Sequence, residues 1–170
     1  LPDSDQSAAM FEMTMELLTA SGYQQYEIAN FARPGCRSRH NQVYWRRGSY
    51  LGFGSGAHSF LREPGFGQRW SNPSGADVYC RAGSAPPTSA TGEPLSKQDA
   101  MGEFLFLGLR LLEGVDPEQF REEFGISIQE AFPGVVERHI ANRLLEMNAG
   151  HISLSRRGIL LANQVFADFT

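Results

Sequence analysis

The sequence is poor in cysteine, in lysine and in long apolar runs, and each shortage excludes a class of protein. Its 170 residues include two cysteines, Cys36 and Cys80, which form neither a disulfide framework nor the C-x-x-C pairs of a structural zinc site. No stretch approaches the roughly 18 consecutive apolar residues of a membrane-spanning helix. No basic, apolar-cored leader opens the chain. We therefore predict a cytoplasmic protein without a membrane span.

The charge balance argues against a nucleic-acid-binding surface. The chain carries 15 basic and 19 acidic residues and a formal net charge of −4. The charges before residue 95 cancel, so the acidic excess lies in the second half of the chain. Such a half would repel a phosphate backbone, and we expect no nucleic-acid partner. Nearly all the basic residues are arginines, whose planar guanidinium groups suit carboxylate and phosphate oxygens.

A Pro-, Gly- and Ser-rich segment, residues 81–94, has the composition of a linker and divides the chain into residues 1–80 and 95–170. The first part opens with a capped helix that ends at Gly22. Alternating polar and apolar residues then predict one strand over residues 23–31. Further short strands are expected near residues 50–53 and 57–61, within an otherwise irregular, glycine-rich region.

The second part has the pattern of a winged-helix-like domain. Capping residues predict helices that begin after Ser96 and Asp116, with a short helical turn at Ser127. Apolar residues at helical spacing predict a third long helix from Val136 to Met147, followed by a strand over residues 151–155. A final helix is expected over residues 159–169.

One glycine motif looks like a dinucleotide-binding fingerprint and is rejected as one. Residues 52–57, with the sequence GFGSGA, satisfy G-x-G-x-x-A. That fingerprint must open a helix, whereas the prolines and glycines of residues 58–73 exclude one. The glycines are therefore expected to allow close packing of the backbone.

A histidine beside two aromatic residues is a candidate axial ligand for haem iron. His40, Tyr44 and Trp45 lie in the segment HNQVYW, in which the aromatic rings can stack on a macrocycle. Cys36 is a weaker alternative ligand. The simpler alternative is an ordinary packed histidine, with the surrounding arginines paired to surface acids. The arginines that we consider for the haem propionates are Arg33, Arg37, Arg39, Arg46 and Arg47.

Five segments resemble the oxygen-independent coproporphyrinogen III oxidase family of radical SAM proteins. They are YEIANFARPG (residues 26–35), RHNQVYW (39–45), YLGFGSGAHS (50–59), GLRLLEG (108–114) and LSRRG (154–158). The H-N-x-x-Y-W block is similar to the haem-chaperone branch of that family. This resemblance implies haem binding by His40, Asn41, Tyr44 and Trp45.

The resemblance also implies what this chain lacks. Members of the family hold a 4Fe-4S cluster on a C-x-x-x-C-x-x-C motif and use S-adenosylmethionine, and this sequence has no such motif. We therefore expect the C-terminal part of a longer protein that itself binds neither cofactor and carries no catalytic residue. The implied fold is α/β, the end of an incomplete radical SAM barrel followed by the winged-helix-like domain.

The expected function is that of a haem chaperone that binds haem and delivers it to an acceptor protein. As the alternative, the full-length parent would be an enzyme that oxidatively decarboxylates coproporphyrinogen III to protoporphyrinogen IX in porphyrin biosynthesis. A second alternative is a protein- or nucleic-acid-binding winged-helix module. An exposed edge of the incomplete sheet would allow a homodimer.

Overall fold

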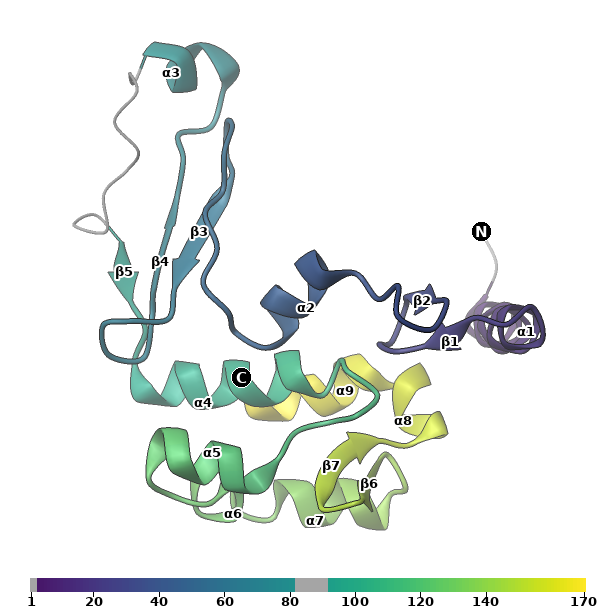
Figure 1. The fold of residues 1–170 in the computed structure, drawn as a ribbon. Coiled ribbons are helices and arrows are strands. Elements are labelled where there is room, and N and C mark those ends of the chain that lie inside the picture. The colour runs from purple at the N-terminus through teal and green to yellow at the C-terminus, as the bar shows by residue number, and fades with distance from the viewer. Residues whose placement is uncertain (1–2, 82–91) are drawn as a thin grey trace.

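The computed structural model describes residues 3–81 and 92–170 and confirms a mixed helix and strand fold (Figure 1). A helical domain, from α4 to α9, forms the base of the molecule in this view. A narrow arm of three strands rises from the base and carries α3 at its tip. Helix α2 lies between this arm and the N-terminal hairpin, directly above α4.

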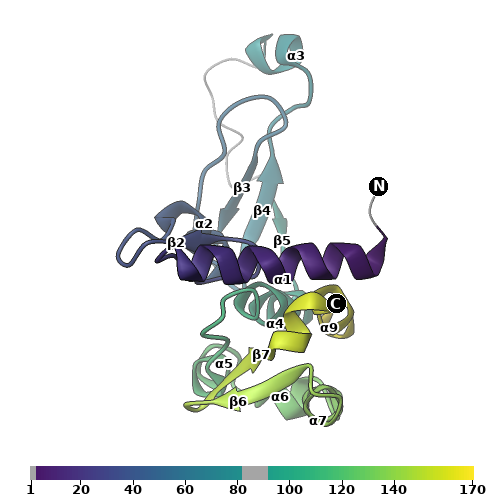
Figure 2. The ribbon, with the colours of Figure 1, turned by 90° about the vertical axis from the view of Figure 1, so that its right-hand side faces the viewer.

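The opening helix is confirmed as α1 (Ser4–Ala20), seen along its length in Figure 2. A capping box starts it: the Asp3 carboxylate accepts the Gln6 amide N–H at 2.8 Å, and the Gln6 side chain accepts the Asp3 amide N–H. Both contacts are local in sequence, which explains why the helix start could be predicted.

The single strand expected over residues 23–31 is wrong, because the chain reverses within it. β1 (Gln24–Gln25) and β2 (Phe31–Ala32) form a short antiparallel hairpin. The buried Glu27 carboxylate accepts hydrogen bonds from the Ala29 amide and the Asn30 side chain, which stabilises the reversal. The turn then pairs with the chain that follows α4: Ile28 donates its amide N–H to the Arg110 carbonyl at 3.0 Å.

Residues 39–81 contain more regular structure than we expected. α2 (Arg39–Trp45) and α3 (Ala76–Arg81) are helices, and β3 (His58–Leu61), β4 (Gln68–Ser71) and β5 (Glu93–Pro94) form an antiparallel sheet in that order. β3 confirms the strand expected near residues 57–61. The strand expected at residues 50–53 is wrong, because only Tyr50 pairs there, in an isolated bridge with Phe60.

The glycine-rich loop leads into β3 and not into a helix, which confirms the rejection of the nucleotide-binding motif. The Asn72 side chain donates to the carbonyls of Gly52 and Gly54, at 3.1 and 2.9 Å. A Cβ atom at Gly52 would lie 2.2 Å from the His58 carbonyl oxygen. Here glycine is needed for close packing of the backbone.

The helices of the helical domain follow one another in the expected order. Its helices are α4 (Lys97–Gly108), α5 (Pro117–Phe124), α6 (Ile128–Ala131), α7 (Val135–Ala141), α8 (Arg156–Leu160) and α9 (Ala162–Phe166), followed by a 3-10 turn (Ala167–Phe169). Ser96, Asp116 and Ser127 cap α4, α5 and α6 as predicted. Of the predicted linker, residues 82–91 lie outside the described residues.

The helix expected from Val136 to Met147 is wrong beyond residue 141. β6 (Leu145–Asn148) replaces its second half and pairs with β7 (His151–Leu154), which confirms the strand expected over residues 151–155. Ala149 and Gly150 form the two-residue turn, both with positive φ (49° and 86°). The expected final helix begins earlier, at Arg156, and is interrupted at Leu161.

The main hydrophobic core lies within the helical domain. Members of this cluster are buried side chains from α4 to the 3-10 turn, among them Leu105, Leu109, Phe120, Ile128, Leu145, Ile152, Val165 and Phe169. The N-terminal half contributes few buried apolar residues, of which Phe60 is the most deeply buried. The helical domain is thus a rigid base on which α2 and the arm are mounted.

Candidate functional site

Helix α2 presents the candidate haem residues on two different faces. The Ser38 side chain caps the helix by accepting the Asn41 amide N–H at 3.2 Å. At 3.6 residues per turn, residues four apart share a face. His40 therefore lies with Tyr44, and Asn41 lies with Trp45.

The outer face holds an exposed imidazole against a row of aromatic rings. The Tyr44 hydroxyl lies 3.1 Å from His40 Nε2, and the two rings meet edge to face with centroids 4.9 Å apart. Tyr44 in turn packs on Tyr50, at 4.4 Å between centroids. None of the described residues hydrogen-bonds to His40 Nδ1. This face therefore offers an oriented imidazole to a ligand from solution.

The inner face packs Trp45 against the helical domain. The Arg110 guanidinium lies 4.3 Å from the centroid of the Trp45 ring, a close cation–π contact. Trp45 Nε1 is buried and has no hydrogen-bond partner among the described residues. The structure thus brings together His40 and Tyr44, but it places Trp45 on the side of α2 that is turned toward Arg110.

Four of the five candidate propionate arginines are exposed around α2. Arg39 makes no ion pair within the described ranges, and the Arg33 guanidinium lies over the Tyr23 ring at 5.5 Å. Arg46 and Arg37 approach the Glu113 carboxylate at 2.7 and 3.8 Å. Since both ion pairs are half-exposed, each contributes little to stability, and an anionic ligand could replace Glu113 as the partner of either arginine.

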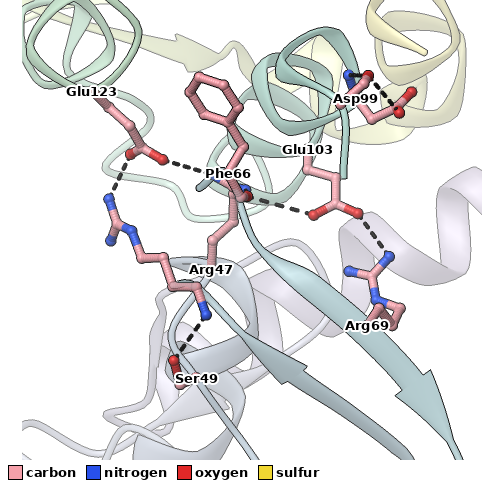
Figure 3. A network of polar contacts seen from close by, with 9 residues as sticks. Arg47, Ser49, Phe66, Arg69, Asp99, Glu103 and Glu123 are labelled. Carbon is pink, nitrogen blue, oxygen red and sulfur yellow. Dashed lines mark hydrogen bonds and ion pairs between the residues drawn. The ribbon is translucent and has the colours of Figure 1, made fainter. Parts of the chain in front are cut away.

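Arg47 is the exception, because it is buried between the two halves of the molecule (Figure 3). Its side chain is 2% exposed and lies 2.7 Å from Glu123 and 3.6 Å from Glu103. It also donates to the Phe66 carbonyl at 2.8 Å. Arg47 thus fastens α2 to α4 and α5, and its guanidinium group has no free surface for a propionate.

Two further arginines complete this network. Arg62 lies 2.5 Å from Glu123, and Arg69 lies 2.7 Å from Glu103. Burial lowers the pKa of Arg69, but the hydrogen bond and the charge of Glu103 more than offset it, so this pKa is raised. The network could not be predicted from the sequence, because partners such as Arg47 and Glu123 are 76 residues apart and no local pattern links them.

The two cysteines lie in separate parts of the fold, and both are exposed. Cys36 precedes α2, whereas Cys80 is in α3 at the tip of the arm. Within residues 3–81 and 92–170, no three His, Cys, Asp or Glu side chains are grouped as a metal site would need. These residues do not fit an iron–sulfur cluster, which needs more thiolates.

No helix in the described part of the chain is both long and apolar enough to cross a membrane.

The fold and the exposed imidazole define a class: a mixed α/β protein in which a short helix with an exposed histidine lies on a winged-helix-like helical domain. Residues 95–161 match the family described as the HemN C-terminal domain. That match covers the second part of the chain, and relatives that align with nearly all of it show that the chain belongs to the HemW family.

The relatives support this assignment along nearly the whole chain. "Heme chaperone HemW" of Bacillus subtilis is 36% identical over 99% of this chain, and that of Lactococcus lactis is 35% identical over 99%. The structure of Escherichia coli coproporphyrinogen III oxidase (HemN), a radical SAM enzyme, superposes over 99% of the chain with a TM-score of 0.71 and 18% identity. The chain spans 44%, 43% and 42% of these three proteins, respectively, which is less than half of each.

Proposed function

We propose that this chain carries the haem-contact surface of a haem chaperone, with His40 as the ligand to the iron. The observation that carries the proposal is the exposed His40 imidazole, oriented by Tyr44 on a capped helix. Its support comes from the relatives, since proteins named heme chaperones align with 99% of the chain.

Tyr44 is the positioning residue in this proposal. A hydrogen bond to one ring nitrogen fixes the orientation of an imidazole and the position of its proton, and so tunes the other nitrogen as a metal ligand. Tyr44 makes this bond to Nε2. The exposed Arg33, Arg37 and Arg39, which precede or begin α2, would supply positive charge for the propionates.

The outer face of α2 suits haem better than the space behind the helix. A cavity of about 250 Å³ lies on the inner side, between Trp45, Arg62, Gln119 and His151. Ligand pockets usually measure about 300–1,000 Å³, so this cavity is small even for a drug-sized molecule. Val43 and Leu51, which neighbour Tyr44 and Tyr50 in the sequence, are exposed apolar residues, and in this proposal they would contact the macrocycle.

A haemin titration followed by visible absorption tests the proposal on the chain itself. We expect a saturable shift of the Soret band that is lost in His40→Ala. His58→Ala is the matched control, because His58 is also exposed but lies on β3. Cys36→Ala tests thiolate ligation. A Soret shift that survives in His40→Ala, or that disappears in Cys36→Ala alone, would overturn the assignment of His40.

We further propose that the chain works within a longer protein, because it spans less than half of its relatives. That protein would hold the 4Fe-4S cluster and S-adenosylmethionine on other residues and pass haem to an acceptor protein. The oxidase alternative rests on a structural likeness at 18% identity, which concerns the fold alone. Turnover of coproporphyrinogen III by the longer protein would favour the oxidase, whereas haem transfer to an apo-acceptor without turnover would support the chaperone.

A further inference from the structure

A second candidate site lies in the helical domain, on residues that the haem proposal does not use. An open cleft of about 410 Å³ runs between the end of α7 and the start of α8 and α9. The residues that line it are two arginines, an asparagine, a glutamine and three apolar residues, and none of them is acidic. These residues are Ala141, Asn142, Arg143, Leu144, Arg157, Leu161 and Gln164.

The backbone around the β6–β7 hairpin brings the two arginines together. Ser155 Oγ donates to the Arg143 carbonyl at 2.6 Å, and the Ser155 amide donates to the Leu144 carbonyl at 3.0 Å. Helix α8 then packs so closely that a Cβ atom at Gly158 would lie 1.9 Å from the Leu144 carbonyl oxygen. The segment LSRRG (residues 154–158) thus holds Arg157 beside residue 143 in a fixed arrangement.

Neither guanidinium group is neutralised by the protein. Arg143 and Arg157 are exposed, and neither side chain makes a hydrogen bond or ion pair with any residue that the structure describes. Their neighbours along the chain behave differently, since Arg138 pairs with Asp168 at 2.7 Å and Arg156 lies 3.7 Å from Glu16. Two arginines without a partner among the described residues therefore line one cleft, in a half of the chain whose net charge is negative.

Arg143 also occupies a backbone conformation that glycine would adopt more easily. Its φ is 58°, in the left-handed region, where a non-glycine residue costs of the order of 1 kcal/mol. An arginine at position 143 therefore lowers the stability of the fold, but it adds a second cationic residue to the lining of the cleft.

We propose that this cleft binds the phosphate group of a small phosphorylated molecule. Arg143 and Arg157 would donate to the phosphate oxygens, as guanidinium groups do in paired geometry. The amide groups of Asn142 and Gln164 would supply further donors. Ala141 and Leu161 would contact the organic part, for which the cleft has room beyond a phosphate ion.

Nuclear magnetic resonance of the arginine Nε–H groups tests this proposal on the 170-residue chain. Inorganic phosphate and phenyl phosphate are the probes, each compared with chloride at equal ionic strength and pH. We expect saturable shifts of the Arg143 and Arg157 signals, with tighter binding of phenyl phosphate. Arg157→Gln should weaken binding about tenfold, because a charge-assisted contact is lost, whereas Arg121→Gln, an exposed arginine on α5, should leave the affinity unchanged.

Arg143→Gly separates binding from folding. This variant relieves the left-handed strain, so its thermal stability without phosphate should equal or exceed that of the parent chain, while the phosphate affinity measured from the Arg157 shifts should fall about tenfold, as in Arg157→Gln. Equal responses to phosphate and chloride, unchanged affinity in Arg157→Gln, or saturable shifts with duplex DNA but not with phenyl phosphate would each overturn the proposal.

Discussion

Replacing Arg47 by methionine should destabilise the protein far more than the same change at Arg46. Both arginines lie 2.7 Å from a carboxylate, Glu123 for Arg47 and Glu113 for Arg46. They differ in burial: the Arg47 side chain is 2% exposed and its partner 15%, whereas the values for the Arg46 pair are 54% and 46%. Burial of the ion pair, and not the distance between its charges, should therefore decide how much each substitution lowers the free energy of unfolding.

The expected magnitude follows from what the loss of Arg47 leaves behind. Removing one partner of a buried ion pair costs about 3–5 kcal/mol, because the other charge remains without compensation. Glu123 keeps Arg62, and Glu103 keeps Arg69, and both of these arginines are partly exposed. We therefore expect about 3 kcal/mol for Arg47→Met, at the lower end of that range. Arg46→Met breaks a surface pair and should cost about 0–1 kcal/mol.

Urea unfolding followed by circular dichroism and tryptophan fluorescence measures both values. Trp45 in α2 and Trp70 in β4 report on the first half, whereas the helical domain supplies the larger share of the helical residues and therefore of the dichroism. If Arg47 couples the two halves, fluorescence and dichroism should give the same urea midpoint in the parent chain and different midpoints in Arg47→Met. Equal costs for Arg46→Met and Arg47→Met would refute the argument from burial.

Three other predictions test separate features of the fold and the site. Gly102→Ala should lower the free energy of unfolding by about 1–3 kcal/mol, since its Cβ would lie 2.2 Å from the Phe169 carbonyl oxygen; a more stable variant in urea unfolding would contradict this packing. The hydrogen bonds from the Ser127 side chain and amide lower the pKa of Glu130, so an NMR titration should give a midpoint below that of an ordinary glutamate, and Ser127→Ala should raise it. The stability gained from Glu130 is therefore present above its unfolded-state pKa and is lost as the pH falls through the folded-state value. Tyr44→Phe should weaken haemin binding about tenfold, because the ring remains but the bond to His40 Nε2 is lost; unchanged affinity in the absorption titration would exclude Tyr44 as the positioning residue.

Much of the helical domain could be predicted because its signals are local. The caps at Ser96, Asp116 and Ser127 each act over two or three residues. The H-N-x-x-Y-W segment could likewise be singled out from its residue types. That His40 and Tyr44 share a face of α2 also follows from helical periodicity, but only once that segment is known to be a helix, and sequence analysis expected irregular structure there.

The failures occurred where pairing with another segment of the chain decides the conformation. Apolar spacing continues from Val136 to Met147 as in one helix, but Leu145 pairs with Leu154 across a hairpin. The pattern over residues 23–31 alternates as in a strand, but the buried Glu27 carboxylate and the contact with Arg110 reverse the chain. In both cases tertiary contacts override a local preference that is worth less than 1 kcal/mol per residue.

The sequence by itself determined the family resemblance, the order of the capped helices and the choice of His40. Only the tertiary structure decided the roles of the arginines, because a guanidinium group has the same chemistry in every arginine and its role depends on burial and on its neighbours. Arg47 lies between the buried Glu103 carboxylate and the partly buried Glu123 carboxylate, Arg46 pairs with Glu113 at the surface, and Arg143 and Arg157 line one cleft without a partner among the described residues. Electrostatic energies vary steeply with solvent exposure and with distance, and neither can be read from the order of residues along a chain.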